Sequence, residues 1–213
     1  EYGAARLHRR EAGVVLEMTQ GIVRDPKCRV GGFTLIELLT TVAIIVVILT
    51  LAAPSFTAFQ RNSELTGVAN TMLSSLSAAR SEAMKRGRNT LVVPSADCST
   101  WGDDWTKGWV VFVDNDASQS LNSGDDVLSC EPKVPEAVTA VAGSAPEGFK
   151  HADGKFYLMF NGSGYPRLLS GAFQSSASLD FTNGDETRRI ISNPAGRLRV
   201  CKPADSGCTA SAL

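Results

Sequence analysis

One acidic side chain stands inside a long uncharged segment. Residues 33–53 carry a single charge, Glu37, in an otherwise apolar run. A carboxylate costs about 2.5–3.5 kcal/mol at the centre of a bilayer, so an acid in a membrane-length segment indicates a function. The chemistry open to it is pairing with a cation, because a paired charge is far less costly to bury than an isolated one. An ordinary signal anchor needs apolar length alone, and Glu37 therefore argues for a more specific role.

Basic side chains gather in residues 187–202, which contain no acid. They are Arg188, Arg189, Arg197, Arg199 and Lys202. Strand alternation over 196–201 would place Arg197 and Arg199 on one face. The planar guanidinium suits phosphate oxygens, and Gly196 permits close backbone approach. The pattern fits a phosphate-binding edge, and the alternative is a solvated strand edge whose charges prevent aggregation.

Acidic residues concentrate in the middle of the chain, where residues 97–147 hold ten acids against Lys107 and Lys133. Asp114, Asp116 and Ser118 have the spacing of a calcium loop, but Gln119 occupies the sixth position, where an EF-hand requires glycine, and no glutamate closes the loop. We interpret this stretch as a solvated acidic loop. The sequence predicts no metal site and no cofactor.

Catalytic constellations are absent from the sequence. His8 lies in the N-terminal region before the apolar run, which leaves His151 as a lone histidine. The stretch Gly162-Ser163-Gly164 lacks the G-x-S-x-G pattern of a triad serine. No phosphate-binding loop or metal-binding H-E-x-x-H helix occurs either. We therefore do not predict an enzyme.

Four of the five cysteines follow the apolar segment. Cys28 precedes it, and the others are Cys98, Cys130, Cys201 and Cys208. An even number in a domain beyond a membrane segment indicates disulfides in an oxidising compartment. A zinc site is disfavoured, because there is no C-x-x-C pair and no nearby histidine. Of the three possible pairings, we favour Cys98–Cys130 with Cys201–Cys208.

The apolar segment has the length of a membrane helix. Residues 33–53 rise about 1.5 Å each, about 31 Å in all, which spans the hydrocarbon core. Pro54 follows and is expected to kink the helix. Apolar residues then recur at three- and four-residue spacing from Leu65 to Ala83, and Gly87 suits a C-cap. We expect an amphipathic continuation of the helix over residues 54–87.

A β-rich head is expected over residues 88–213. The predicted strands are 90–93, 108–114, 126–130, 156–161, 178–182, 187–192 and 196–201. The run from Val110 to Val113 is apolar at every position, which predicts a strand covered on both faces.

Turns and tryptophans refine this expectation. The stretches 161–164 and 183–185 have the composition of hairpin turns. Trp101, Trp105 and Trp109 could stack on nucleic-acid bases, but we expect Trp109 in the core and the other two as loop anchors.

Residues 1–32 form a separate leader region. The chain begins with Glu1, and Met18 is the candidate start of a leader that ends at Gly32. Basic residues just before the apolar run favour a cytoplasmic N-terminus. We expect residues 1–32 to be a leader and not part of the folded protein.

Residues 32–39 resemble the processing site of type IV pilins and type II secretion pseudopilins. Their sequence is G-F-T-L-I-E-L-L, in which Gly32 precedes Phe33. The resemblance implies cleavage after Gly32 by a prepilin peptidase, methylation of Phe33, and pairing of Glu37 with the amino group of a neighbouring subunit's Phe33. It implies an inner-membrane protein with a single span that joins other pilin or pseudopilin subunits. The implied fold is α+β and type IV pilin-like, a long N-terminal helix packed on a globular head of antiparallel β-sheets.

Two further motifs resemble the FimT/GspH family within this group. Residues 78–87, A-A-R-S-E-A-M-K-R-G, resemble its helix end, and residues 108–114, G-W-V-V-F-V-D, resemble its G-W-x-V-F-x-D strand, so the resemblance covers residues 31–201. Gly196, Arg197 and Arg199 match the G-R-x-R motif of FimT-type minor pilins. That match implies DNA binding without sequence preference, in natural transformation at a cell-surface pilus. The alternative is a GspH-like minor pseudopilin of a type II secretion system, with protein partners only.

Overall fold

A computed structural model describes residues 32–142 and 149–209, without the side chains of residues 51–54. The predictions for the leader, including a start at Met18, concern residues 1–31 and lie outside this range. The chain divides into two compact units between Val46 and Val47.

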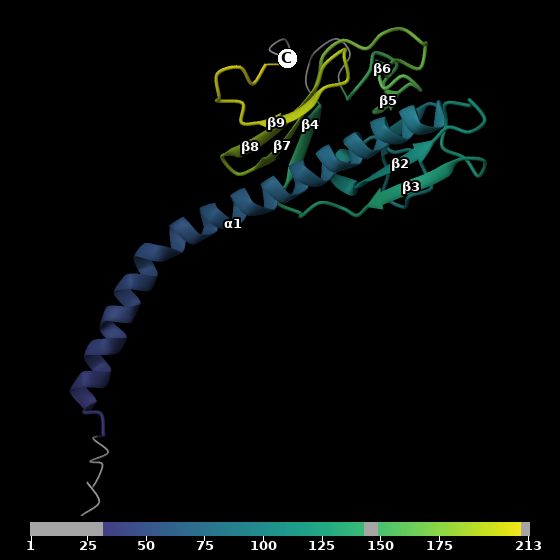
Figure 1. Ribbon diagram of the computed structural model, residues 1–213. Helices are drawn as coiled ribbons and strands as arrows, with labels where there is room; N and C mark the ends of the chain where they lie inside the picture. Colours follow the sequence, from purple (N-terminus) through teal and green to yellow (C-terminus); the bar gives the residue numbers. More distant parts are fainter. Residues whose placement is uncertain (1–31, 143–148, 210–213) are drawn as a thin grey trace, which may run out of the picture. The chain divides into compact units, whose positions relative to one another are not determined.

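A helix, α1, runs from Leu35 to Arg86 (Figure 1). The hydroxyl of Thr34 accepts a hydrogen bond from the backbone N–H of Glu37 at 3.2 Å, which satisfies one free donor of the first turn. The helix ends where predicted, at Gly87, whose φ of 65° is the left-handed conformation of a C-cap. Lys85 and Arg86 lie in the last turn, where their charge complements the helix dipole.

Among the described residues, no single helix meets the length and apolarity needed to cross a membrane. The stretches Leu35–Thr50 and Ser55–Arg86, taken together as a broken pair, meet that requirement by length and composition. The break between them contains Pro54, where the sequence predicts a kink.

The first sheet has five antiparallel strands in the order β3-β2-β1-β5-β6. Its strands are β1 (Thr90–Pro94), β2 (Trp109–Val113), β3 (Asp126–Glu131), β5 (Leu158–Phe160) and β6 (Pro166–Arg167). Every residue of β2 is buried, which confirms the predicted strand covered on both faces. A short 3-10 helix, η1 (Trp105–Lys107), lies in the loop before β2.

The second sheet has four antiparallel strands in the order β4-β7-β8-β9. They are β4 (Thr139–Ala142), β7 (Ala177–Asn183), β8 (Glu186–Ser192) and β9 (Leu198–Cys201). Asn183 pairs with Glu186, so the predicted turn does join two strands of one hairpin.

The main core lies between α1 and both sheets (Figure 1). Leu65, Met72 and Leu76 are fully buried on the predicted apolar face of the helix. The cluster includes residues from both sheets, among them Trp109, Val111, Leu158, Leu179, Phe181 and Ile190. The C-terminal part of α1 therefore packs against both sheets of the head, and this packing positions the strand ends and the turns between them.

A second cluster fills the opposite face of the first sheet. Its buried members are Leu91, Val93, Val110, Phe112, Tyr157 and Met159. Loop residues Trp101, Leu121 and Leu169 pack on this cluster. The long loops therefore form the outer layer of the head.

The structure corrects three predictions. Strands β4 and β6 were not predicted. Strand β4 is an edge strand whose four residues alternate between exposed and half-buried, and β6 has two residues and begins with a proline. Trp105 is not a loop anchor but a core residue, 2 % exposed and edge-to-face with Phe149. Strand β9 begins at Leu198, so Gly196 and Arg197 belong to the preceding turn.

The predictions for the other two tryptophans are confirmed. Trp109 is buried in the core, and Trp101 donates a hydrogen bond from a loop to the Phe156 carbonyl.

Candidate functional site: the exposed helix segment and the basic hairpin

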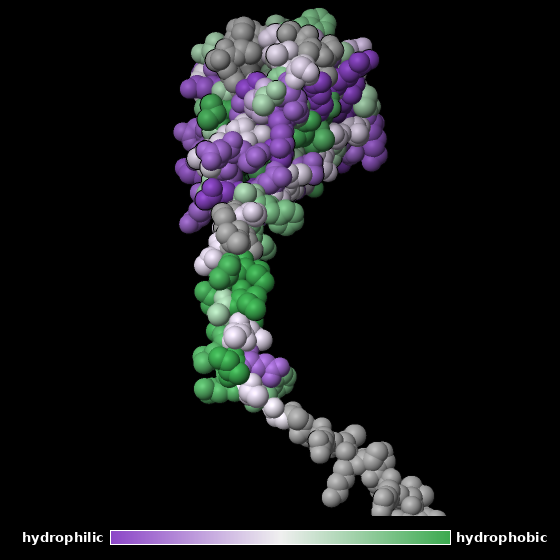
Figure 2. All heavy atoms as spheres, turned by 90° about the vertical axis from the view of Figure 1, so that its left-hand side faces the viewer, coloured by the Kyte–Doolittle hydropathy of each residue, from purple (hydrophilic) through white to green (hydrophobic). Residues whose placement is uncertain are grey.

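The N-terminal part of α1 presents large apolar side chains without cover. Phe33 is 86 % exposed and Leu35 78 %, and the following apolar residues to Leu49 are at least half exposed. Hydrophobic side chains dominate the visible face of this stretch, in contrast to the mostly hydrophilic face of the head (Figure 2). A continuous apolar surface of this size marks a membrane or protein contact.

Glu37 lies in the first turn of α1, four residues after Phe33. Its side chain is exposed and makes no ion pair with any residue of the described ranges 32–142 and 149–209. The positive end of the helix dipole favours an acid here. The chain thus places one carboxylate at the end of an apolar surface and leaves its charge for a partner.

The predicted basic strand is part of the β8–β9 hairpin. In its turn, the Gly196 N–H donates to the Asn193 carbonyl at 2.8 Å, and the Arg197 N–H donates to Asn193 Oδ1 at 2.8 Å. The Arg197 side chain is exposed and has no hydrogen bond or ion pair within the described part of the chain. Arg197 is therefore accessible to an anion.

Arg188 and Arg189 have structural partners instead. Arg188 is 8 % exposed and binds Asn62 of α1 and Glu186 of its own strand. Arg189 makes a two-point ion pair with Asp180, at 2.7 and 2.6 Å, which raises the pKa of Arg189. The prediction that these residues line a basic surface does not fit their contacts, since neighbouring strands and the helix take up their charges.

Arg199 and Lys202 are partly engaged. Arg199 is half-buried and donates to the Gly207 carbonyl, and Lys202 lies 3.4 Å from Glu186. Hydrogen bonds from Arg188 and Lys202 lower the pKa of Glu186, which keeps that carboxylate charged beside them. Of the five cations predicted from the sequence, Arg197 alone is exposed without a partner among the described residues.

Both disulfides have the predicted pairing. Cys98 joins Cys130 and Cys201 joins Cys208, with Cα–Cα distances of 5.7 and 5.8 Å. The second bridge holds the segment after β9 beside the hairpin, where the Cys208 carbonyl accepts a hydrogen bond from Arg189.

The acidic loop contains one buried carboxylate, that of Asp114, beside the exposed Asp116 and the half-buried Asp125. Carboxylate oxygens of Asp114, Asp116 and Asp125 lie within 4.8 Å of one another, and burial raises the pKa of Asp114. Gln119 has a φ of 55°, a conformation that favours glycine, and its N–H donates to Asp114. This convergence was not predicted, because Gln119 occupies the position where an EF-hand requires glycine.

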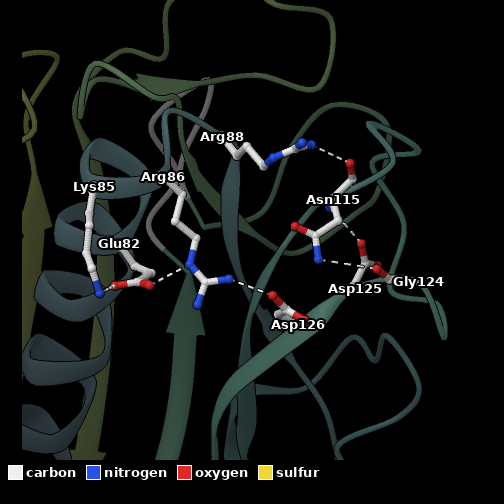
Figure 3. A network of polar contacts seen from close by, with 8 residues as sticks. All are labelled: Glu82, Lys85, Arg86, Arg88, Asn115, Gly124, Asp125 and Asp126. Carbon is white, nitrogen blue, oxygen red and sulfur yellow. Dashed lines mark hydrogen bonds and ion pairs between the residues drawn. The ribbon is translucent and has the colours of Figure 1, made fainter.

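A polar network ties this loop to the end of α1 (Figure 3). Arg86 bridges Glu82 at 2.5 Å and Asp126 at 2.6 Å, and Arg88 donates to the Asn115 carbonyl. The pKa of Glu82 is lowered by its hydrogen bond with Arg86. The residues 78–87 picked out by sequence resemblance therefore anchor the helix end to the head.

Arg80 is a residue whose contacts the sequence analysis missed. Its Nε donates to the Gly164 carbonyl at 3.0 Å and its Nη2 to the Ala195 carbonyl at 3.2 Å. Arg80 stands next to Ala79, which lies on the predicted apolar face of α1. An arginine close to a buried face needs hydrogen-bond partners, so its position in the sequence could have predicted such contacts.

The fold and the exposed helix segment together define a class of protein: a pilin-like subunit with a long N-terminal helix and an antiparallel β head. A family model described as "Type II transport protein GspH" matches residues 68–196, and one described as "Prokaryotic N-terminal methylation motif" matches residues 27–53. The chain belongs to the GspH family. Its N-terminal segment carries the methylation motif of a prepilin-type anchor in the inner membrane.

Solved structures similar to this chain include minor pilin FimU of Pseudomonas aeruginosa, at 19% identity and a TM-score of 0.48, covering 71% of this chain and 98% of FimU. Minor pseudopilin EpsH of Vibrio cholerae matches at 16% identity and a TM-score of 0.45, covering 67% of this chain and 99% of EpsH. No curated protein matches the chain.

Proposed function

We propose that the chain is cleaved after Gly32, is held in the inner membrane by residues 33–53, and joins a filament through its N-terminal helix. The observation that carries this proposal is the exposed apolar surface from Phe33 to Leu49 with Glu37 as its one charge. Lipid covers that surface before assembly, and the helices of neighbouring subunits cover it afterwards.

Glu37 sets the register of a subunit in the filament. Cleavage after Gly32 creates a new amino group at Phe33, and a carboxylate four residues along the helix can pair with that group on a neighbouring subunit. A buried ion pair with one partner missing costs about 3–5 kcal/mol. A subunit out of register leaves both charges unpaired, so pairing selects one arrangement.

Replacement of Glu37 tests this role. We expect Glu37→Ala to insert into the membrane normally and to fall at least tenfold in sheared filaments, because the amino group of its neighbour loses its partner. Quantitative immunoblots of membrane and filament fractions measure both. Glu136→Ala is the control, since the Glu136 side chain is 90% exposed on the head. Normal incorporation of Glu37→Ala would contradict the proposal.

Processing at Gly32 can be tested separately. A bulkier residue, as in Gly32→Leu, should block the peptidase and leave a slower-migrating band in the membrane fraction. A normally processed Gly32→Leu protein would place the cleavage elsewhere.

We also propose that the subunit binds DNA through Arg197, with Arg199 beside it. The side chain of Arg197 is exposed on a hairpin turn and has no partner among residues 32–142 and 149–209, which supports this function. Arg199 follows two residues later in β9, where its half-buried side chain donates to the Gly207 carbonyl. The competing role, a type II pseudopilin with protein partners only, does not require Arg197.

Gel-shift titration of the full chain in detergent tests DNA binding. Duplexes of unrelated sequence should bind alike and more weakly as salt rises, because phosphate contacts release counterions. Arg197→Ala should weaken binding to each and reduce the salt slope by about 1. Arg61→Ala is a matched control, an exposed arginine of α1. Unchanged affinity for Arg197→Ala would remove this residue from the site.

A further inference from the structure

One guanidinium connects the long helix to both sheets of the head. The two carbonyls that accept hydrogen bonds from Arg80 belong to turns far apart in the sequence. Gly164 lies in the turn that joins β5 to β6 in the first sheet, and Ala195 in the turn that joins β8 to β9 in the second. Arg80 is thus a bridge between two turns on separate sheets.

The two turns also contact each other through their backbones. A Cβ added to Gly196 would lie 2.5 Å from the Gly164 carbonyl oxygen and 3.0 Å from Arg80 Nε. Gly196 has a φ of 75° and Gly164 a φ of 78°, both in the left-handed region. A side chain at Gly196 would collide with the Gly164 backbone, so the close approach depends on Gly196 and on the arginine that satisfies the two carbonyls.

This bridge bears directly on Arg197, the next residue after Gly196. From these contacts we infer that Arg80 is a positioning residue, which holds the β8–β9 turn so that Arg197 is presented to DNA. The inference rests on the proposed DNA function and adds a residue that does not itself touch the nucleic acid. A fixed turn spares the ordering cost that a mobile contact residue would incur on binding.

The chemistry at residue 80 requires arginine. Its planar fork offers donors in fixed directions to two carbonyls, whereas a lysine ammonium is a single point of charge on a flexible stem. We therefore expect both Arg80→Ala and Arg80→Lys to loosen the turn, although Arg80→Lys keeps the positive charge. Loss of affinity in the lysine variant separates positioning from a general charge effect.

Hydrogen exchange measures the bridge without DNA. In the full chain in detergent, peptides covering residues 193–197 should exchange at least tenfold faster in Arg80→Ala than in the native protein. The N–H groups of Gly196 and Arg197, which are hydrogen-bonded in the native turn, report this change. Arg61→Ala should leave the same peptides unchanged. If these peptides exchange at the native rate in Arg80→Ala, the inference is overturned.

A double-mutant cycle measures the consequence for DNA. We expect Arg80→Ala and Arg197→Ala each to weaken duplex binding at least threefold, and the double variant to bind no more than twofold worse than Arg197→Ala. Such non-additivity shows that Arg80 acts through Arg197. Additive losses would instead make Arg80 an independent contact and would overturn its positioning role.

The outcomes separate this inference from the function on which it rests. Full affinity of Arg197→Ala would contradict the proposed DNA contact, and with it the inferred effect of Arg80 on DNA, whatever the exchange data show. Weaker binding by Arg197→Ala together with native binding by Arg80→Ala would leave the function standing and remove the inference.

Discussion

At the scale of single residues, local chemistry decides which polar groups are available to a partner. Glu37 and Arg197 are exposed and unpaired within the described residues, whereas Arg188 and Arg189 are held by Asn62, Glu186 and Asp180. Sequence alone placed all of them in functional sites, because charge and spacing do not reveal which cations have neighbours across a sheet. Cross-strand partners depend on register, and register is a tertiary property.

A glycine substitution tests the close approach of the two turns. Gly196→Ala places a Cβ 2.5 Å from the Gly164 carbonyl oxygen, in addition to the cost of a left-handed alanine. Gly171→Ala is a matched control, since its φ is 84° but nothing lies within 4 Å of the added Cβ. Left-handed strain costs about 1–2 kcal/mol, and we expect Gly196→Ala to lose about 1–3 kcal/mol more than the control. Urea unfolding measures both, and equal losses would contradict the steric argument.

At the scale of elements, the sequence predicted those whose patterns are strongest. The stripe from Leu65 to Ala83 and the buried β2 run were found, because period and apolarity agree with burial there. Strand β4 was missed because its exposed and half-buried positions alternate among small residues. Strand β6 has two residues and depends on pairing with β5 rather than on its own propensity. The disulfide pairing was predicted correctly, whereas Gly196 and Arg197, which lie in the turn before β9, were predicted as strand.

The two disulfides should stabilise the head unequally. Loop-closure entropy predicts a loss of about 3.7 kcal/mol on removing Cys98–Cys130 and about 2.5 kcal/mol on removing Cys201–Cys208, since the bridges span 32 and 7 residues. Paired serine substitutions followed by urea unfolding measure the order. A greater loss of stability on removing Cys201–Cys208 would contradict the predicted order. It would indicate that native contacts of the segment after β9 contribute more to stability than loop-closure entropy.

At the scale of the whole molecule, acid should weaken the head. Hydrogen bonds and nearby cations lower the pKa of Asp97, Glu82, Asp126 and Glu186. A lowered pKa in the folded state means stability that is present above the ordinary values, 3.8 for Asp and 4.5 for Glu, and lost as pH falls through the folded values. Burial raises the pKa of Asp114, which acts in the opposite direction.

Thermal unfolding between pH 7 and pH 2 measures this balance. We expect the Tm to fall steadily below about pH 4.5 as the carboxylates that bind Arg86, Arg188 and Lys202 become protonated. Arg86→Gln should flatten the dependence, because it removes a partner of both Glu82 and Asp126. A Tm that rises toward pH 2 would show that Asp114 outweighs the others.

The central claim is that this GspH-family chain is a processed subunit assembled through its N-terminal helix. Mass spectrometry of the N-terminal peptide of the protein in sheared filaments tests it most directly. The expected result is a peptide that begins at N-methylated Phe33 and is absent from filaments of cells producing Glu37→Ala. Filament-bound protein with residues 1–32 intact, or Glu37→Ala present at the native level, would contradict the claim.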